Sequence, residues 1–280
     1  MKQYVIKTNH KVKNNYTVID SLSFDYDELF IKNVEEFKKK ANKNKKYAIF
    51  YPSFGIPKDD KPEFLIYGQA VKGWDPVFNS SLKLNKKQLL KKAIDNSNKY
   101  YKGKNHTPLD WVNVYWGKSY YRKFVTTEAD KKFYPPMPYS TFRSFFWNVT
   151  YKLICRYYDL DKNSWDWSRK LVWSNLYKIA PAEGKNPNEE ECSWQKKISI
   201  ELIKNEIEEI KPKFCIVLTN DSWWKPFRDK LKTEVLTHSK LKKGIIQSIE
   251  LYNGTKIIVT TRPYSGNSAN HVNEILELIK

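Results

Sequence analysis

Four short apolar runs punctuate the chain, and each is bounded by residues that favour turns. They are FLIY at 64–67, KLVWS at 170–174, FCIVL at 214–218 and IIVTT at 257–261. Continuous apolar runs of this length, rich in β-branched and aromatic residues, are typical of strands that are buried on both faces. The pattern therefore predicts four buried strands.

Helical periodicity marks the segments between these runs. Asn188 can cap a helix that Pro212 would stop, with isoleucines repeating at helical spacing between them. A crossover helix is predicted over 139–158 and a last helix begins near Ser268. The expected buried stripe of the crossover helix comprises Phe142, Phe145, Phe146, Val149 and Leu153.

Strands that alternate with helices indicate right-handed crossovers and a parallel sheet covered on both faces. We therefore predict an α/β fold, a three-layer α/β/α sandwich around a mostly four-stranded parallel sheet. Residues 51–280 should form this domain, with an insertion at about 77–138 between the first strand and its crossover helix. Residues 1–50 are expected to be a basic N-terminal extension packed on the domain.

Charge adds a partner to this picture. The 280 residues include 50 Lys and Arg against 31 Asp and Glu, which gives a formal net charge of +19. Such an excess attracts polyanions and favours DNA, single- or double-stranded, as a partner. The alternative is a lysine-rich coding bias that leaves the charge as a solvated surface. An apolar content of 40% with 15% aromatics excludes a mainly disordered chain.

Cysteine usage and hydropathy exclude several classes. Cys155, Cys192 and Cys215 are too scattered for a disulfide framework, and no C-x-x-C pair suggests zinc or an iron–sulfur cluster. We predict neither a metal nor a cofactor. The first residues lack the apolar core of a signal peptide, and no run approaches the roughly 18 apolar residues of a membrane span. We expect a cytoplasmic monomer that does not bind membranes.

Ligands of an open parallel sheet bind beyond the carboxyl ends of its strands. Gly68 follows the first strand and permits close approach of a ligand. Asn175 ends the second and offers a donor and an acceptor to a base edge. Residues 265–268 precede a helix whose free N–H groups would bind a phosphate. An ordinary loop glycine, a turn-forming asparagine and simple capping by Ser268 are the alternatives.

The ordered set of strand-end segments resembles the uracil-DNA glycosylase superfamily. It comprises Gly-Gln after the first strand, a strand-Asn segment leading to NPNEEEC, a helix ending IKPK, and a last strand opening a Pro-Tyr-Ser loop. The resemblance spans about 51–280 without the insertion and is strongest over 171–218. It implies a DNA glycosylase, which flips a base into a pocket and hydrolyses its N-glycosidic bond.

The resemblance also implies roles for individual residues. Gly68 and Gln69 would abut the flipped base and position the hydrolytic water, and Asn175 would read the Watson–Crick edge. The loop from Arg262 to Ser265 would contact the DNA backbone and stabilise the departing base anion. From the same segments we assign further residues to base binding (Ala70 and Trp74) and to the DNA backbone (Ser265, Asn267, Ser268 and His271).

Two positions depart from the family pattern. Many members carry an acidic residue just after the first strand, where this chain has Gln69 and Ala70, so that Asp75 is the candidate substitute. The histidine common in the last motif is Arg262 here, which donates to an anion but does not titrate near neutrality. Three interpretations stay open: a glycosylase for a uracil-like or modified base, a glycosylase for a bulky modified base of phage DNA, and a catalytically silent nucleic-acid binder. An Asp75 or His271 that points into the crevice would favour an enzyme.

Overall fold

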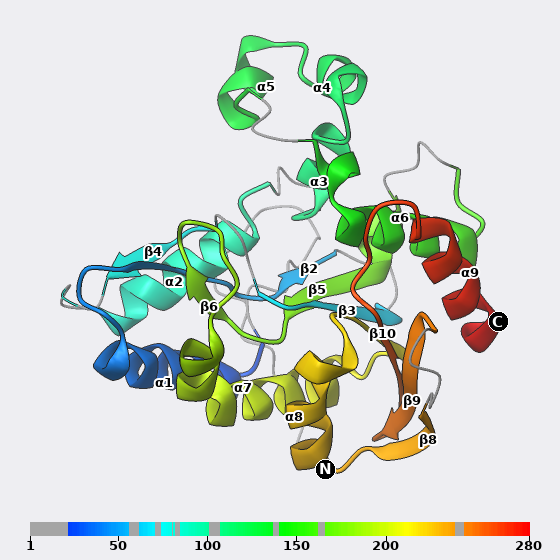
Figure 1. Cartoon of the computed structure of the whole chain (residues 1–280). Helices are drawn as coiled ribbons and strands as arrows, with labels where there is room; N and C mark the ends of the chain where they lie inside the picture. The colour runs from blue at the N-terminus through cyan, green and yellow to red at the C-terminus, as the bar shows by residue number, and fades with distance from the viewer. Residues whose placement is uncertain are drawn as a thin grey trace, which may run out of the picture.

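The computed structural model describes residues 22–55, 62–70, 74–79, 81, 85–100, 107–136, 140–161, 166–238 and 244–280. Over these residues the fold is mixed α/β and contains a seven-stranded sheet with the strand order β2-β5-β3-β7-β10-β9-β8 (Figure 1). Its strands are β2 (Ser53–Phe54), β3 (Phe64–Gly68), β5 (Leu171–Asn175), β7 (Phe214–Leu218), β8 (Glu234–His238), β9 (Ile246–Tyr252) and β10 (Thr255–Thr260).

The four predicted strands are confirmed as β3, β5, β7 and β10, and they are neighbours. They pair in parallel in the order β5-β3-β7-β10. The prediction of a mostly four-stranded parallel sheet was too narrow, because β2 joins one edge and β9 and β8 join the other, all antiparallel. These edge strands have no continuous apolar run, since β2 has two residues and β9 is mostly half-buried.

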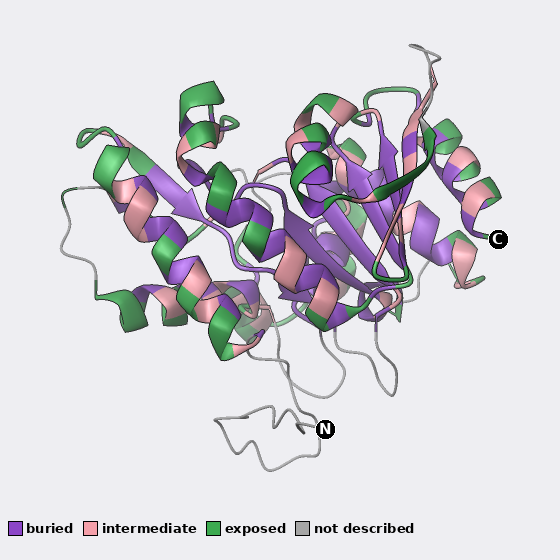
Figure 2. Ribbon diagram, turned by 90° about the horizontal axis from the view of Figure 1, so that it is seen from below, coloured by how far each residue is buried: buried purple, intermediate pink, exposed green. Residues whose placement is uncertain are grey.

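Helices cover both faces of the sheet. Alternate residues of β3 show this, because Phe64 and Ile66 belong to one apolar cluster and Leu65 and Tyr67 to the other. Buried strands lie in the middle of Figure 2, and the helices around them have exposed outer faces. One cluster receives α3 (Asp110–Val114), α6 (Phe145–Tyr157) and α9 (Ser268–Ile279), and the other α1 (Phe24–Lys40), α7 (Glu189–Ile210) and α8 (Asp221–Leu231).

Helix ends follow the predicted signals in α7 and α9. Asn188 caps α7 in a reciprocal box with Glu191, and the helix ends at Ile210, before a left-handed Lys211 and Pro212. The start of the last helix near Ser268 is also confirmed. These helix ends could be predicted because capping residues and proline act locally, whatever the tertiary structure around them.

The predicted stripe of the crossover helix was partly wrong. The α-helix begins only at Phe145, after the 3-10 turn η1 (Thr141–Arg143), so Phe142 is outside its periodicity. Phe142 and Phe145 are 53% and 39% exposed, and Phe146 is half-buried. The stripe is buried only farther along the helix, at Val149 and Leu153.

The remaining elements come from the N-terminal region and the insertion. The helix α1 shares its apolar cluster with α7, and β1 (Lys46–Ile49) pairs with β4 (Val77–Asn79) and β6 (Ile179–Pro181) in a small antiparallel sheet. Residues 1–21 of the expected extension lie outside the described residues. The other helices are α2 (Lys86–Ser97), α4 (Lys118–Phe124), α5 (Glu128–Phe133) and the 3-10 helix η2 (Asp166–Lys170). None of the described helices is both long and apolar enough to cross a bilayer.

Candidate functional site

Hydrogen bonds join the carboxyl ends of neighbouring parallel strands. Gln69 Nε2, after β3, donates to the carbonyl oxygen of Thr219, after β7, at 3.1 Å. Asn220 N donates to Thr260 O at 2.9 Å, and Arg262 N donates to Asn220 Oδ1 at 2.6 Å. The segments selected from the sequence therefore lie along one edge of the sheet. The chain leaves β3 toward β5 and leaves the adjacent β7 toward β10 on the other side, so a topological switch point lies between β3 and β7.

Gly68 and Asn175 lie opposite each other at this edge. They are partners in the register of β3 and β5, and a Cβ on Gly68 would lie 2.6 Å from Asn175 Oδ1. Asn175 is 2% exposed, and its Nδ2 is buried without a hydrogen-bond partner among the described residues. A buried amide left unpaired costs about 1–3 kcal/mol. A buried polar group without a partner calls for an explanation, such as a functional role or a bound water or ion.

Aromatic side chains lie on the face of the sheet to which Asn175 belongs. Trp173 lies two residues before Asn175 on the same face of β5, and the Trp74 ring packs edge-on against it at 5.2 Å between centroids. A ring carbon of Phe146 lies 3.6 Å from the Cβ position of Gly68. Trp74 Nε1 is a second buried N–H without a partner among the described residues. We name these five residues, Gly68, Trp74, Phe146, Trp173 and Asn175, the strand-end site.

Gln69 and Ala70 do not join the strand-end site. Both ends of the Gln69 amide are used within the protein, because Oε1 accepts a hydrogen bond from Asn186 Nδ2 at 2.8 Å while Nε2 binds Thr219. Gln69 therefore holds strand ends together. Ala70 packs on the apolar cluster opposite to that of Trp74. The structure thus separates Ala70 from the other residues assigned to base binding.

Asp75 and His271 differ in accessibility. Asp75 is exposed and follows Trp74 directly, and its carbonyl oxygen accepts a hydrogen bond from Asn96 Nδ2 at 2.8 Å. His271 is fully buried, with Nδ1 3.1 Å from Asn267 O and Nε2 3.0 Å from Thr261 O. The imidazole is enclosed within the protein, so a DNA backbone could not contact it in this conformation. Asp75 remains as the accessible carboxylate.

The amino terminus of α9 carries features of an anion site. Asn267 is its N-cap, but Asn267 Oδ1 accepts a hydrogen bond from Tyr264 N and leaves the first helical turn uncapped by a side chain. Lys152 of α6 reaches this point, with Nζ 3.4 Å from Ser268 Oγ. Ser265 is exposed. Free N–H groups, the helix dipole and an ammonium group together favour a phosphate. Lys152 was missed from the sequence, because it carries no motif.

Arg262 lies at the same edge and is exposed. Its guanidinium makes no hydrogen bond or ion pair to another residue in the described part of the chain. Its strand, β10, is three positions from β5 in the sheet, which corresponds to about 14 Å at the usual strand spacing. Arg262 therefore follows a strand that is well separated from the one that ends in Asn175.

A buried ionic network beneath the site was also missed from the sequence. Lys178 Nζ donates to Ser174 Oγ at 2.7 Å and to Asn175 O at 2.6 Å, and it pairs with Glu206 Oε1 at 2.6 Å. Both charged side chains are fully buried. Burial lowers the pKa of Lys178, against the opposing effect of Glu206. The available signal was a charged residue at a core position, within the apolar KIAP segment.

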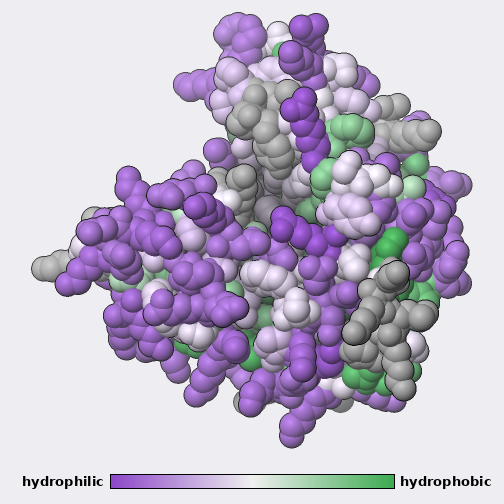
Figure 3. All heavy atoms as spheres, viewed as in Figure 1, coloured by the Kyte–Doolittle hydropathy of each residue, from purple (hydrophilic) through white to green (hydrophobic). Residues whose placement is uncertain are grey.

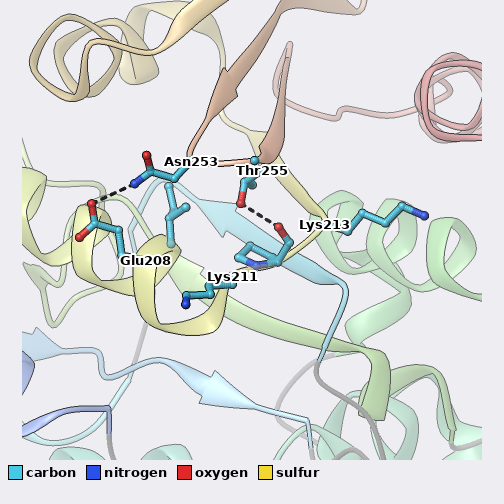
Figure 4. A pocket seen from close by; sticks show the side chains of 8 residues that line it. Glu208, Lys211, Lys213, Asn253 and Thr255 are labelled. Carbon is cyan, nitrogen blue, oxygen red and sulfur yellow. Dashed lines mark hydrogen bonds between the residues drawn. The ribbon is translucent and has the colours of Figure 1, made fainter. Parts of the chain in front are cut away.

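A surface depression of about 340 Å³ lies at the opposite end of the strands. Figure 4 shows Asn253 donating to Glu208 at 3.1 Å and Thr255 donating to a carbonyl oxygen at 2.7 Å, while Lys213 points away. The depression borders the amino ends of β7 and β10, and the Asn253 and Thr255 side chains at its wall are hydrogen bonded within the protein. It is not at the edge where a sheet of this kind binds ligands. Its lining comprises Ile207, Glu208, Lys211, Pro212, Lys213, Asn253, Gly254 and Thr255.

The helices α4 and α5 form a basic lobe at the top of Figure 1. Neither helix buries a residue, and Lys131 pairs with Glu128 across one turn of α5. Figure 3 shows a mostly hydrophilic face that is hollowed between this lobe and the body of the molecule. The lobe therefore adds positive charge beside a concave surface. Its basic residues are Lys118, Arg122, Lys123, Lys131 and Lys132.

Metal and thiol chemistry have no support in the described residues. Within them, no three His, Cys, Asp or Glu residues are grouped to hold a metal ion. Burial raises the pKa of Cys155 and of Cys192 to about 11, and it also raises the pKa of Cys215 well above its ordinary value. Thiols with a raised pKa are poor nucleophiles at neutral pH.

No family model matches the chain, and no curated protein matches it in sequence. The interpretation of function therefore rests on the geometry of the strand ends.

Proposed function

We propose that the chain binds nucleic acid along the carboxyl edge of its parallel strands, accepts an extruded base in the strand-end site and hydrolyses its N-glycosidic bond. The observation that carries this proposal is the Asn175 amide: its Nδ2 is buried without a partner within the described residues, while its Oδ1 lies against Gly68. A turn-forming asparagine would use its amide locally. We interpret the helices on the two faces as the outer layers of a three-layer α/β/α sandwich that presents this edge.

The chemistry of the site favours a base that offers acceptors. The two unpaired polar atoms of the strand-end site, Asn175 Nδ2 and Trp74 Nε1, are both N–H donors. A carbonyl oxygen on a base edge would satisfy such a donor, whereas an exocyclic amino group would not. Neighbouring aromatic rings suit the flat face of a base. A uracil-like base is therefore the favoured ligand.

Phosphate contacts would position the strand. The amino terminus of α9, Lys152 beside it and the exposed Arg262 provide three sources of positive potential on this edge. The net charge of +19 adds a long-range attraction that salt would screen.

The reaction needs few groups. The bond between C1′ and the base nitrogen breaks, the electron pair leaves with the base, and a water oxygen bonds to C1′ while its proton passes to a carboxylate. We assign that carboxylate to Asp75, because it is exposed and adjacent to Trp74. Asn175 Nδ2 would stabilise the negative charge that develops on the base.

A second candidate is a nucleic-acid binder that reads a base without cleaving it. Two observations favour it: both ends of the Gln69 amide are hydrogen bonded within the protein, and both ring nitrogens of His271 face backbone oxygens. Such a protein would share the base-binding edge and lack the hydrolytic step.

Strand scission distinguishes the two candidates. Oligonucleotides that carry a panel of normal, deaminated and bulky modified bases are incubated with the protein and then treated with alkali, which cleaves abasic sites. If the protein is the proposed enzyme, we expect scission at one class of base and a scission rate at least about 10²-fold lower in Asp75→Asn. Asp95→Asn, an exposed carboxylate on α2 paired with Lys91, is the matched control. Base-dependent binding without scission would leave the silent binder.

A further inference from the structure

We propose that Lys178 is a positioning residue for Asn175, and that the buried Lys178–Glu206 pair serves to fix the turn that carries the base-reading amide. This inference rests on the proposed function of Asn175 and adds a residue that neither contacts a base nor lies on the surface.

The turn after β5 is held from both sides. On the β3 side, Leu176 N donates to Gly68 O at 2.9 Å and Tyr177 N donates to Gln69 O at 3.1 Å. On the other side, Lys178 Nζ donates to Asn175 O at 2.6 Å. The Asn175 peptide therefore has its carbonyl direction set by an ammonium group, close to the side chain that faces Gly68.

Each N–H donor of the Lys178 ammonium group has an acceptor within the protein. An ammonium group has three N–H donors, and Lys178 directs them to Ser174 Oγ, Asn175 O and Glu206 Oε1. Glu206 also accepts hydrogen bonds from two tyrosine hydroxyls, Tyr26 to Oε1 at 2.6 Å and Tyr67 to Oε2 at 2.8 Å. The carboxylate thereby connects α1, β3 and α7 to the end of β5.

Stability alone gives a poor account of this arrangement. A buried ion pair is often replaced by apolar residues of similar volume without loss of stability, because desolvation offsets the attraction between the charges. A methionine at position 178 would fill similar space but could not bind Asn175 O. What the ion pair supplies, and an apolar pair would not, is a fixed orientation of the Asn175 carbonyl group. Asn175 is also the residue whose Nδ2 has no partner among the described residues.

The test separates positioning from stability. In Lys178→Met/Glu206→Gln both charges are removed together and an acceptor for the tyrosines is kept. We expect this variant to melt cooperatively and to lose at least 10-fold of the parent's preference between its best base and the next best. Amide hydrogen exchange of Leu176 and Tyr177 should accelerate at least 10-fold relative to the amides of β7. Tyr26→Phe is the matched control, because it removes a hydrogen bond to the same carboxylate and leaves Asn175 O bound. It should keep the parent's base preference and exchange pattern.

The outcomes are distinct. Parental base preference and parental exchange in the folded double variant would overturn the positioning role. Should the double variant not fold, Lys178→Arg carries the same test, since a planar guanidinium cannot reproduce the compact three-way contact. A parent without any base preference would defeat the proposed function, and the exchange rates of Leu176 and Tyr177 would still decide whether Lys178 holds the turn.

Discussion

Gly68 and Asn175 face each other across β3 and β5 so closely that a Cβ on the glycine would lie 2.6 Å from Asn175 Oδ1. A side chain at position 68 is therefore incompatible with the observed direction of the Asn175 amide. The pair explains why β3 ends in glycine, and it makes the shape of the site depend on one backbone position.

Gly68→Ala tests this relationship. The added methyl group should displace the Asn175 side chain, reduce discrimination among bases and lower the free energy of unfolding by about 1–3 kcal/mol, as overpacking does. Gly117→Ala is the control, because a Cβ there meets no atom within 4 Å and its φ of 171° is extended. Urea melts and base-panel binding check both variants. An alanine at 68 that leaves the base preference unchanged would show that the two residues do not form a binding site.

Asn175→Ala should separate function from stability. Discrimination among bases should fall by about 1–3 kcal/mol, the contribution of one good base contact, while non-specific binding persists. The free energy of unfolding should not fall, because the lost Nδ2 has no partner among the described residues and its removal relieves an unpaired donor. Competition binding and denaturant melts measure the two effects. A variant that keeps its base preference would place the reading group elsewhere.

Lys152→Ala and Arg262→Ala should act on the phosphate contacts. Each should weaken binding about equally for every base and reduce the slope of log affinity against log salt by about 0.9 per lost duplex contact. Lys197→Ala is the control, because this exposed lysine lies on α7, which covers the other face of the sheet. Salt titrations of duplex binding give the slopes. Equal slopes in the parent and both variants would remove α9 and Arg262 from the interface.

Asp27 makes stability depend on pH. Burial raises the pKa of its carboxyl group from 3.8 to about 6, while the hydrogen bond from Tyr51 opposes the shift. The protonated form is favoured in the folded state, so this contribution to stability is full below pH 3.8 and is lost as pH rises through about 6. The free energy of unfolding of the parent should therefore fall relative to Asp27→Asn between those values. Urea melts of both proteins across this range check the sign, and a constant difference between them would contradict it.

The sequence predicts the centre of the fold better than its edges. The strands β3, β5, β7 and β10 are continuous apolar runs because helices cover both their faces, whereas β9 is mostly half-buried and has no such run. The start of α6 was predicted too early, because the segment before Phe145 is also rich in apolar residues but does not belong to the α-helix.

The candidate site was predicted in part for similar reasons. Gly68 and Asn175 stand at the carboxyl ends of parallel strands, a position that marks candidate ligand-binding residues before any contact is known. His271 was assigned to the DNA backbone but is buried. Its spacing of four residues from Ile275, and of eight from Ile279, could have placed it on the buried stripe of α9. Lys178 and Glu206 are 28 positions apart, and a pair that only the fold brings together leaves no local pattern.

The most direct test of the central claim is the side-chain amide resonance of Asn175, assigned by its loss in Asn175→Ala and followed by nitrogen-15 NMR during titration with an oligonucleotide that carries a uracil-like base. The account predicts that the Nδ2 protons shift downfield as they gain an acceptor, and that the same oligonucleotide with an abasic site leaves them in place. Backbone shifts along the carboxyl edge of the sheet with an unmoved Asn175 amide would contradict it, since the nucleic acid would then bind without placing a base in the strand-end site.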